Sequence, residues 1–205
     1  MQTKILKYAE LNMNKATSNG QLIFDNKNKL PFKEYIRGVY KALGLKYPKF
    51  FKMDELCQLA VITTEMLLGE GSDYSGEHTA LILGNKNSSL VSDTNHYATI
   101  SSEENYFPSP AVFVYTLPNI MLGEICIKHK ITGENSCFMM EELDAKFLYE
   151  YASQLFKVEE YKHCITGFVD YEEEEYIAKL FLIGYDEDDQ SSDSRFDENF
   201  NKNIP

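Results

Sequence analysis

The chain has 205 residues with 43% hydrophobic content, which suits one globular domain of about five or six strands with helices packed on them. Its formal net charge of −12 argues against nucleic acids and anionic membrane surfaces as partners, because phosphate groups favour surfaces rich in lysine and arginine. Tryptophan is absent, so the 14 tyrosines and 13 phenylalanines supply the large side chains for packing.

Four cysteines, Cys57, Cys126, Cys137 and Cys164, are scattered singly through apolar stretches. No two have the short spacing of a zinc knuckle or a redox motif, so we expect buried free thiols in a reducing cytoplasm. The N-terminal residues lack the apolar run of a signal peptide, and no segment is long enough to span a bilayer. We therefore expect a cytoplasmic protein with no metal, no cofactor and no membrane span.

Two helices are predicted in the first third of the chain. Over residues 31–43, apolar side chains recur at three- and four-residue spacing, with a proline at the start and Gly44 just past the end. Asp54 is a good N-cap for a second helix that runs to Leu68, and Gly69 can end it.

A short apolar run, Thr79–Leu83, predicts a buried strand that ends at Gly84. The next stretch, Asn85–Asn105, is rich in serine, asparagine and aspartate and is predicted to be a loop. It follows a strand as a phosphate-binding loop would, but it lacks the second glycine and the Lys-Ser/Thr pair that grip phosphate. A helical region is predicted from Ser109 to His129, and Pro118 must kink or break it.

The remaining elements alternate between strand and helix. They are a strand at Ser136–Met140, a helix at Glu141–Lys157, and two strands at His163–Val169 and Tyr176–Gly184 joined by the acidic run Glu172–Glu175. This alternation predicts an α/β fold. We expect one domain over residues 1–185, followed by an acidic tail over 186–205 whose composition is typical of disorder.

Three short patterns are poor candidates for chemistry. Cys126 and His129 could share a metal ion, but no second pair at ligand spacing accompanies them, so a core thiol is the better interpretation. His163 and Cys164 are adjacent on a predicted strand and point to opposite faces, which prevents them from acting as base and nucleophile. The acidic run Glu172–Glu175 is more typical of a solvated turn than of a metal site.

A longer series of motifs is more specific. The segment Phe107–Ile120, followed by Gly123–Ile127 and Ile131–Asn135, resembles the β-ketoacyl-acyl-carrier-protein synthase family. Further similarities lie, in the family's order, at residues 47–54, 81–84, 143–157 and 164–170, so the resemblance covers roughly residues 45–170. It implies half of a ketoacyl synthase fold, which is a thiolase-like α/β architecture with helices packed on a mixed sheet.

The resemblance also locates what is missing. The family presents a nucleophilic cysteine at a sharp turn before a buried helix, and the matching position here is Glu142 or Leu143. A carboxylate suits a helix N-terminus but cannot replace a thiolate that attacks a thioester. The two histidines and frequent lysine of the family come from its second half, which the matched residues do not reach. The resemblance thus implies that ketoacyl synthase chemistry is absent.

We therefore expect a non-catalytic partner or accessory subunit in a fatty-acid, polyketide or polyene-pigment biosynthetic system. The resemblance implies a homodimer, or a heterodimer with a full ketoacyl synthase. In the family, the strand before the nucleophile turn pairs antiparallel with its mate across a two-fold axis. The corresponding strand here consists of Ser136, Cys137, Phe138, Met139 and Met140, without a proline or a charge to discourage edge pairing. The plainer alternative is that this strand is central in the monomer's own sheet.

Two other functions remain open at this point. The chain could be a condensing enzyme that is completed by a partner subunit or uses Cys137, although that thiol has no cationic neighbour in the sequence to lower its pKa. It could also be a module that binds an acyl chain or an acyl carrier protein. Carrier proteins are usually acidic, so this function needs a basic patch, for which the candidates are Lys41, Lys46, Lys49 and Lys52.

Overall fold

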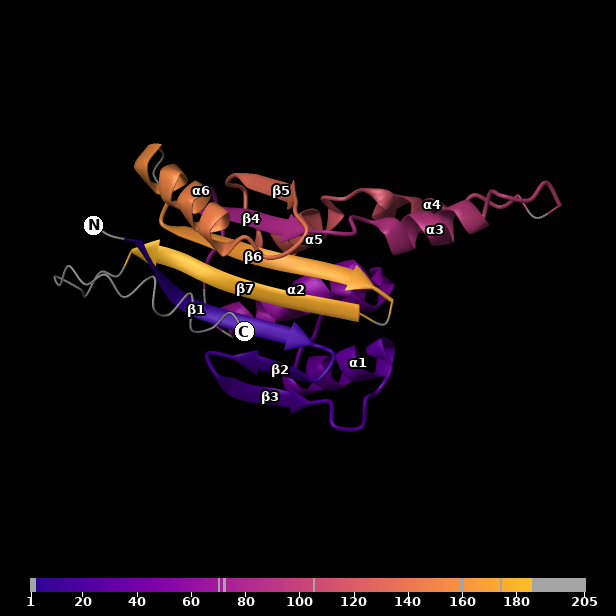
Figure 1. Cartoon of the computed structure of the whole chain (residues 1–205), viewed down its shortest axis with the longest axis horizontal. Coiled ribbons are helices and arrows are strands. Elements are labelled where there is room, and N and C mark those ends of the chain that lie inside the picture. Colours follow the sequence, from indigo (N-terminus) through magenta and orange to yellow (C-terminus); the bar gives the residue numbers. More distant parts are fainter. Residues whose placement is uncertain are drawn as a thin grey trace.

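The computed structural model describes residues 3–69, 71, 73–104, 106–158, 161–173 and 175–185, and for Val158 the backbone only. The described strands form one mixed sheet in the order β3-β2-β1-β7-β6-β4-β5 (Figure 1). They are β1 Thr3–Asn12, β2 Lys15–Ser18, β3 Gln21–Asp25, β4 Thr79–Asn85, β5 Asn135–Met139, β6 His163–Glu172 and β7 Glu175–Tyr185. The predicted α/β class with a mixed sheet is confirmed, and the predicted tail at 186–205 lies outside the described residues.

The parallel part of the sheet lies at the β5 edge. Strand β4 runs between β5 and β6 and is parallel to both, whereas β7 is antiparallel to β6 and β1 is antiparallel to β7. The hairpin β2–β3 extends the sheet at the other edge. The C-terminal ends of β4, β5 and β6 therefore lie at the same end of the sheet. In α/β proteins the connections that leave this end commonly carry ligand-binding and catalytic residues.

Helices cover both faces of the sheet and create three layers. On one face, α1 (Phe32–Ala42), α2 (Glu55–Leu68) and α5 (Ile120–His129) share the main core with side chains of β4, β6 and β7. On the other face, α6 (Ala145–Val158) packs on a smaller cluster that includes Ile82, Cys164 and Ile183. Helix α2 is apolar on nearly all sides because it lies between the sheet and its neighbouring helices.

The two predicted N-terminal helices are confirmed at nearly the predicted bounds. Asp54 caps α2 as expected, because its Oδ1 accepts a hydrogen bond of 2.9 Å from the backbone N–H of Cys57. Strands β4 to β7 lie where the apolar runs predicted them. Helix α6 begins at Ala145 rather than at Glu141, because Asp144 supplies the cap that starts it: its Oδ1 accepts from the N–H of Phe147.

Two segments depart from the prediction. The stretch 85–105 is not a continuous loop, because helix α3 spans Leu90–Ala98. Its single buried side chain is that of Ser92, so it has no apolar period to reveal it. The helical region after Ser109 is broken as predicted near Pro118, into α4 (Pro110–Phe113), the 3-10 turn η2 (Val114–Thr116) and α5.

No single helix in the described part of the chain is long and apolar enough to cross a membrane. Two consecutive helical segments, Pro110–Thr116 and α5, are together long and apolar enough for a membrane span, but the chain bends by 100° between them. Helix α5 buries Met121, Leu122 and Ile125 in the main core, so that part of the pair is already packed against protein.

We predict that Gly167→Ala is much more disruptive than Gly44→Ala. Both glycines have positive φ, of 149° and 64°, but a Cβ on Gly167 would overlap the carbonyl oxygen of Lys179, whereas one on Gly44 meets nothing within 4 Å. At Gly44, alanine costs only the backbone strain, about 1 kcal/mol of unfolding free energy. At Gly167 the overlap adds to this strain, and the total loss is about 3–5 kcal/mol.

Urea denaturation of the two variants measures this difference. Equal losses of unfolding free energy would contradict the close packing of β6 against β7.

Candidate functional site

The residues at which the family nucleophile was expected lie in the connection between β5 and α6 (Figure 1). Met140 begins it, donating its backbone N–H to the Asn85 carbonyl at 3.0 Å, and its side chain covers Gly84. Glu142 is exposed, and Leu143 is half-buried against Ala145 and Phe181. The connection is thus closed by apolar packing on the sheet and offers a carboxylate, not a thiol, to solvent.

The N-terminus of α6 is satisfied by its own chain. Asp144 accepts from the N–H of Phe147 through Oδ1 at 2.9 Å and from the N–H of Leu148 through its carbonyl at 3.1 Å. A carboxylate at this end is favourable for the helix dipole as well as for the unpaired N–H groups. Asp144 thus places a carboxylate at the start of α6.

The outward face of α6 is polar. Leu148, Ala152 and Phe156 are buried on its inner side. The side chains that point away from the sheet are exposed, and they are Lys146, Glu150, Gln154 and Lys157. Lys146 Nζ and Glu150 Oε1 are 4.0 Å apart, one helical turn from each other. This helix covers one face of the sheet with its apolar side and presents a charged side to water.

Strand β5 lies at the edge of the sheet described here, so it is not central in the monomer. The Glu134 carbonyl accepts from Leu81 N–H at 2.8 Å, and Met140 N–H donates to Asn85. Since alternate residues of a parallel strand bond to the same neighbour, the backbone groups of Asn135, Cys137 and Met139 face outward. Among the described residues no strand pairs with these groups, so they are a template for another strand.

The side chains of β5 separate by face. Phe138 packs on α6, with ring centroids 4.9 Å from Phe147 and 5.1 Å from Tyr151. Cys137 is half-buried on the other face, with Sγ 3.8 Å from the Pro118 carbonyl, and Met139 is 56% exposed. Phe138 therefore supports the fold, and Met139 is the large apolar side chain that the edge presents to solvent.

The loop after β4, which resembled a phosphate-binding loop in position, already holds an anion from its own chain. Asp170 Oδ1 accepts from the backbone N–H groups of Lys86 at 3.2 Å and of Asn87 at 2.8 Å. Its Oδ2 accepts from Asn87 Nδ2 at 2.7 Å, and Asn85 Nδ2 also bonds to Oδ1. Asp170 is 8% exposed, so this carboxylate fills the position and leaves no room for a phosphate.

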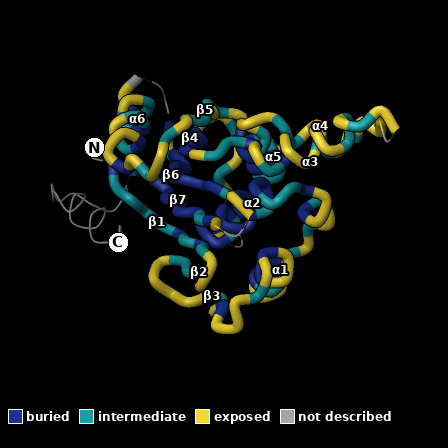
Figure 2. The backbone as a smooth tube through the Cα atoms, turned by 45° about the vertical axis from the view of Figure 1, so that its right-hand side comes forward, coloured by how far each residue is buried: buried dark blue, intermediate teal, exposed yellow. Residues whose placement is uncertain are grey.

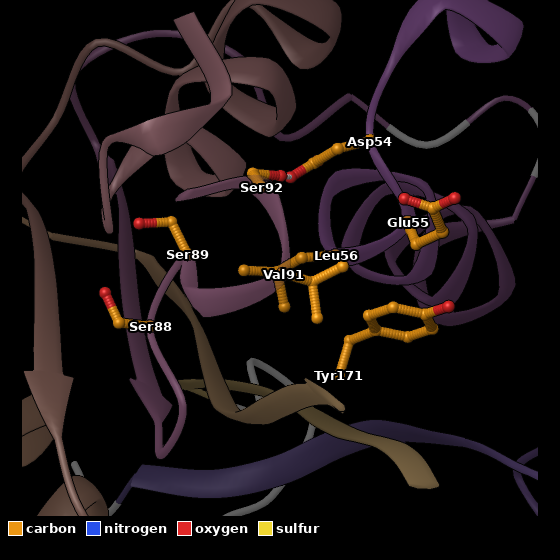
Figure 3. A pocket seen from close by; sticks show the side chains of 8 residues that line it. All are labelled: Asp54, Glu55, Leu56, Ser88, Ser89, Val91, Ser92 and Tyr171. Atoms are coloured by element: carbon orange, nitrogen blue, oxygen red, sulfur yellow. Dashed lines mark hydrogen bonds between the residues drawn. The ribbon is translucent and has the colours of Figure 1, made fainter. Parts of the chain in front are cut away.

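A shallow cleft lies beside this loop, at the N-terminus of α2 (Figure 3). It measures about 190 Å³ with the space open to solvent included, and its lining is Asp54, Glu55, Leu56, Ser88, Ser89, Val91, Ser92 and Tyr171. Ser92 Oγ donates to Asp54 Oδ2 at 2.7 Å across it. Ligand pockets usually measure about 300–1,000 Å³ and are mainly apolar, so this acidic cleft does not suit an acyl chain.

All four cysteines are free, and burial raises the pKa of each thiol above its usual value. Cys164 is buried on the α6 face, while the ring of the neighbouring His163 makes an edge-to-face contact with Tyr74, with centroids 4.8 Å apart, so the two residues point apart as predicted. A raised pKa leaves little thiolate at neutral pH, which makes these poor nucleophiles.

Cys126 and His129 are not brought together with further ligands. His129 Nε2 lies 2.7 Å from Glu65 Oε1, which Lys128 Nζ also approaches at 2.8 Å. Burial alone would raise the pKa of Glu65, but the hydrogen bonds from His129 and Lys128 outweigh it and lower this pKa. The described residues contain no group of three or more His, Cys, Asp or Glu side chains arranged for a metal ion.

The candidate basic patch is smaller than its sequence indicates. Lys41, Lys46 and Lys52 are exposed, but Lys49 is half-buried and its Nζ pairs with Glu124, which is 3% exposed on α5. Lys49 is thus used to neutralise a buried carboxylate.

No protein-family model matches the sequence, and no curated protein matches it significantly. Solved structures do match over most of the chain. A structure titled as the ishigamide ketosynthase/chain length factor has a TM-score of 0.65 at 15% identity, over 93% of this chain and 64% of that one. A ketosynthase in complex with its chain length factor from Xenorhabdus doucetiae has a TM-score of 0.56 at 12% identity, over 91% of this chain and 80% of that one.

A third match is a type II polyketide-synthase acyl carrier protein in complex with its ketosynthase, with a TM-score of 0.59 at 7% identity, over 89% of this chain and 58% of that one. The chain spans less than two thirds of the first and third of these proteins. At such identities the likeness concerns the fold. It confirms the thiolase-like ketosynthase fold that the sequence motifs indicated.

We predict that Asp54→Asn is as stable as the natural protein at pH 7 or more so. Burial raises the pKa of Asp54, against the lowering effect of the hydrogen bonds from Cys57 and Ser92, so the fold favours the protonated acid. The contribution of this group to stability is then largest at low pH and is lost as pH rises from about 4 through the folded-state pKa.

Asparagine keeps the N-cap without the charge, so the unfolding free energy of Asp54→Asn should change less with pH across this range. Asp54→Ala, the control, loses the cap and should lie about 1 kcal/mol below Asp54→Asn at each pH, since neither variant titrates at this position. Denaturation curves at pH 4 and pH 7 give these unfolding free energies. If Asp54→Asn lost as much unfolding free energy as Asp54→Ala, the fold would favour the ionised carboxylate and the prediction would be wrong.

Proposed function

We propose that this chain is a non-catalytic, ketosynthase-like subunit of a fatty-acid, polyketide or polyene-pigment biosynthetic system. It acts in a reducing cytoplasm by pairing with another synthase-fold chain, either a full ketoacyl synthase or a second copy. The observation that carries this proposal is the β5–α6 connection. It contains Glu142 and Leu143, to which counting along the sequence motifs assigns the family's cysteine, and Asp144 caps the helix that follows.

The outward face of α6 supports the same conclusion. In the resembled family the corresponding helix is buried, whereas here Lys146, Glu150 and Lys157 are exposed on it. Packing the second half of a synthase on this face would bury these charges, and each unpaired buried charge costs several kcal/mol. The charged outer side of α6 therefore disfavours packing of a second layer that would bring catalytic residues to this face.

The open edge of the sheet supports pairing. The backbone groups of Cys137 and Met139 face outward, and the strand carries no charge or proline that would block another strand. Two of the similar structures are named as ketosynthases with chain length factors, which makes a synthase-fold chain the natural partner to propose. Binding of an acyl carrier protein is a secondary candidate, because Lys49 is withdrawn from the basic patch.

A condensing enzyme that uses Cys137 is the less favoured function. Burial raises the pKa of this thiol, so only a small fraction is ionised at neutral pH. The other face of the strand provides aromatic packing with α6.

We predict that no covalent acyl-enzyme forms. The pure protein, incubated at pH 7 with acyl-carrier-protein thioesters and measured by intact mass, should keep its unmodified mass, while a cysteine-bearing ketosynthase in the same buffer gains the acyl group. Iodoacetamide should also label all four cysteines slowly, because burial disfavours each thiolate. An acyl adduct located on Cys137 would establish the enzymatic function instead.

We predict that Met139→Pro and Met139→Lys abolish pairing with the partner. Proline removes an outward N–H without breaking the bonds to β4, and lysine places a charge at the seam. Met139→Leu is the matched control, since it keeps both the N–H and the apolar side chain. Phe138 is unsuitable for this purpose because its ring packs on α6.

Sedimentation velocity is run on each variant alone and mixed with each full-length ketosynthase of the host organism, with thermal denaturation to verify the fold. Unchanged complexes with folded Met139→Pro and Met139→Lys variants would show that β5 is not the seam.

A further inference from the structure

The outer face of α1 is basic, in a chain whose formal net charge is −12. Residues 33–52 contain six of the chain's 20 lysines and arginines, and their single acidic residue is Glu34. Lys33, Arg37 and Lys41 follow each other four residues apart, so they lie on one side of the helix, and all three are exposed. Figure 2 shows exposed residues along α1, whose other side is buried against the main core.

The 3-10 helix η1 (Pro48–Lys52) extends this basic surface. The ring centroid of Phe51 lies 4.8 Å from that of Tyr40, and the guanidinium carbon of Arg37 lies 6.0 Å from the Phe51 centroid. Phe51 is 48% exposed, and the exposed side chains of Lys46 and Lys52 belong to the same segment. We call this surface the basic face, and it consists of Lys33, Arg37, Lys41, Lys46, Phe51 and Lys52.

Most cations of the basic face have no carboxylate beside them. Lys33 Nζ lies 3.3 Å from Glu55 Oε1. In the part of the chain that the structure describes, no carboxylate pairs with the other four, which are Arg37, Lys41, Lys46 and Lys52. Like charges one helical turn apart destabilise a helix by about 0.2–0.5 kcal/mol per pair. A polyanion that lies on the basic face would therefore stabilise α1.

The C-terminal segment 186–205 has the complementary composition. It lies outside the described residues, and its sequence contains seven acidic residues against two basic ones. Four of the acidic residues are consecutive, Asp186–Asp189, and the aromatic residues of the segment are Phe196 and Phe200. The segment thus offers a run of negative charge for the lysines and aromatic rings for the exposed ring of the basic face.

The segment is long enough to reach the basic face. It follows Tyr185, the last residue of β7, which pairs with Thr3 at one end of the sheet. Helix α1 begins near the other end, where the ring centroid of Phe32 lies 4.9 Å from that of Tyr176 at the start of β7. The 11 residues of β7 span about 36 Å, whereas twenty extended residues reach about 66–72 Å. A tethered segment has an effective concentration on the order of millimolar, so even weak ionic contacts hold it in place.

We propose that residues 186–205 bind the basic face of the same molecule and close it to other anionic partners. The acidic run lies over the lysines of α1 and η1, and the contact holds by charge. Nucleic acids and anionic membranes are disfavoured as occupants, because the net negative charge of the whole chain repels them. The inference goes beyond the proposed function and does not depend on it, because the contact forms within one chain.

Zero-length crosslinking of the full chain tests this contact. A carbodiimide joins carboxylates to the lysine amines that touch them, and peptide mass spectrometry identifies each joined pair. The protein is crosslinked as an equimolar mixture of unlabelled and isotope-labelled chains, at about 0.01 M and about 1 M NaCl, between which the Debye length falls from about 30 to about 3 Å. The pair Lys33 and Glu55 is the internal control for the reagent, since the fold holds these side chains together.

We expect crosslinks between acidic residues of the segment and Lys41, Lys46 or Lys52, each within chains of one isotope. Their yield should be about fivefold or more lower at high salt, because the contact is ionic and exposed. This part of the test uses the natural protein alone.

Variants of α1 add a second measurement. Arg37→Gln combined with Lys41→Gln should lower the yield at the remaining lysines of the basic face by about threefold or more, because two of its charges are gone. Lys146→Gln combined with Lys157→Gln is the matched control, since it removes the same charge from the exposed side of α6 on the other face of the sheet. This control should leave the yield unchanged, and thermal denaturation verifies that each variant is folded.

Three results would overturn the proposal. Links from the segment to Lys162 alone, which lies beside the end of β7, would show that the segment stays near its origin. Links that join the two isotopes would place the segment on a second copy. If the segment forms no link to the basic face while Lys33 and Glu55 are joined, the face is free, and crosslinking of added polyglutamate to it would identify an acidic partner as the occupant instead.

Discussion

The structure depends on one buried amide at the end of β4. Asn85 is 0% exposed, and its Nδ2 donates to the Val169 carbonyl at 2.8 Å and to Asp170, while its backbone carbonyl accepts from the N–H of Met140. Its Oδ1 also accepts from the N–H of Ser88. The Asn85 side chain thus joins the ends of β4 and β6, and its backbone carbonyl holds the residue that follows β5, so this one residue sets the direction in which the chain leaves the sheet. Loss of a buried polar group of this kind leaves several partners unpaired at once.

This junction connects the two features on which the proposed function relies. On one side it positions the β5–α6 connection, where Asp144 rather than a thiol meets the helix N-terminus. On the other side it starts the segment that runs through α3, α4 and η2 to Pro118, whose carbonyl lies 3.8 Å from Cys137 Sγ on β5. The connection after the edge strand carries no cysteine at Glu142 or Leu143, and the edge of the sheet at β5 is open in the described part of the chain. A subunit that associates without catalysing is the function that this combination supports.

Much of the fold could be predicted from the sequence where local signals are strong. The spacing over residues 31–43 and the cap at Asp54 identified the first two helices, and short apolar runs identified β4 to β7. Strands β1 to β3 were missed, because β1 mixes lysines with apolar residues and has a bulge between Ile5 and Lys7. The turn Asn19-Gly20, with both residues at positive φ, was the available signal of that hairpin. Helix α3 carried no such signal.

The candidate site divides in the same way. Counting along the motifs assigned the missing nucleophile to Glu142 or Leu143, at the start of the predicted helix. The structure instead has both residues in the connection between the edge strand β5 and α6. The polar side of α6 can be predicted from the spacing of its charged residues once the helix is assigned. By contrast, Asp170 fills the loop after β4 from 83 residues away, and Lys49 neutralises Glu124 from 75 residues away. Long-range pairs of this kind leave no local pattern.

Hydrogen exchange of the backbone amides of Cys137 and Met139 tests the central claim most directly, because both N–H groups face outward from β5. The account predicts that these amides exchange quickly in the free chain. They should become protected when the partner ketosynthase is added, as a new strand pairs with the edge. If a complex forms and both amides exchange as quickly as before, the chain does not pair through β5, and the account of this protein as an edge-pairing, non-catalytic subunit is contradicted.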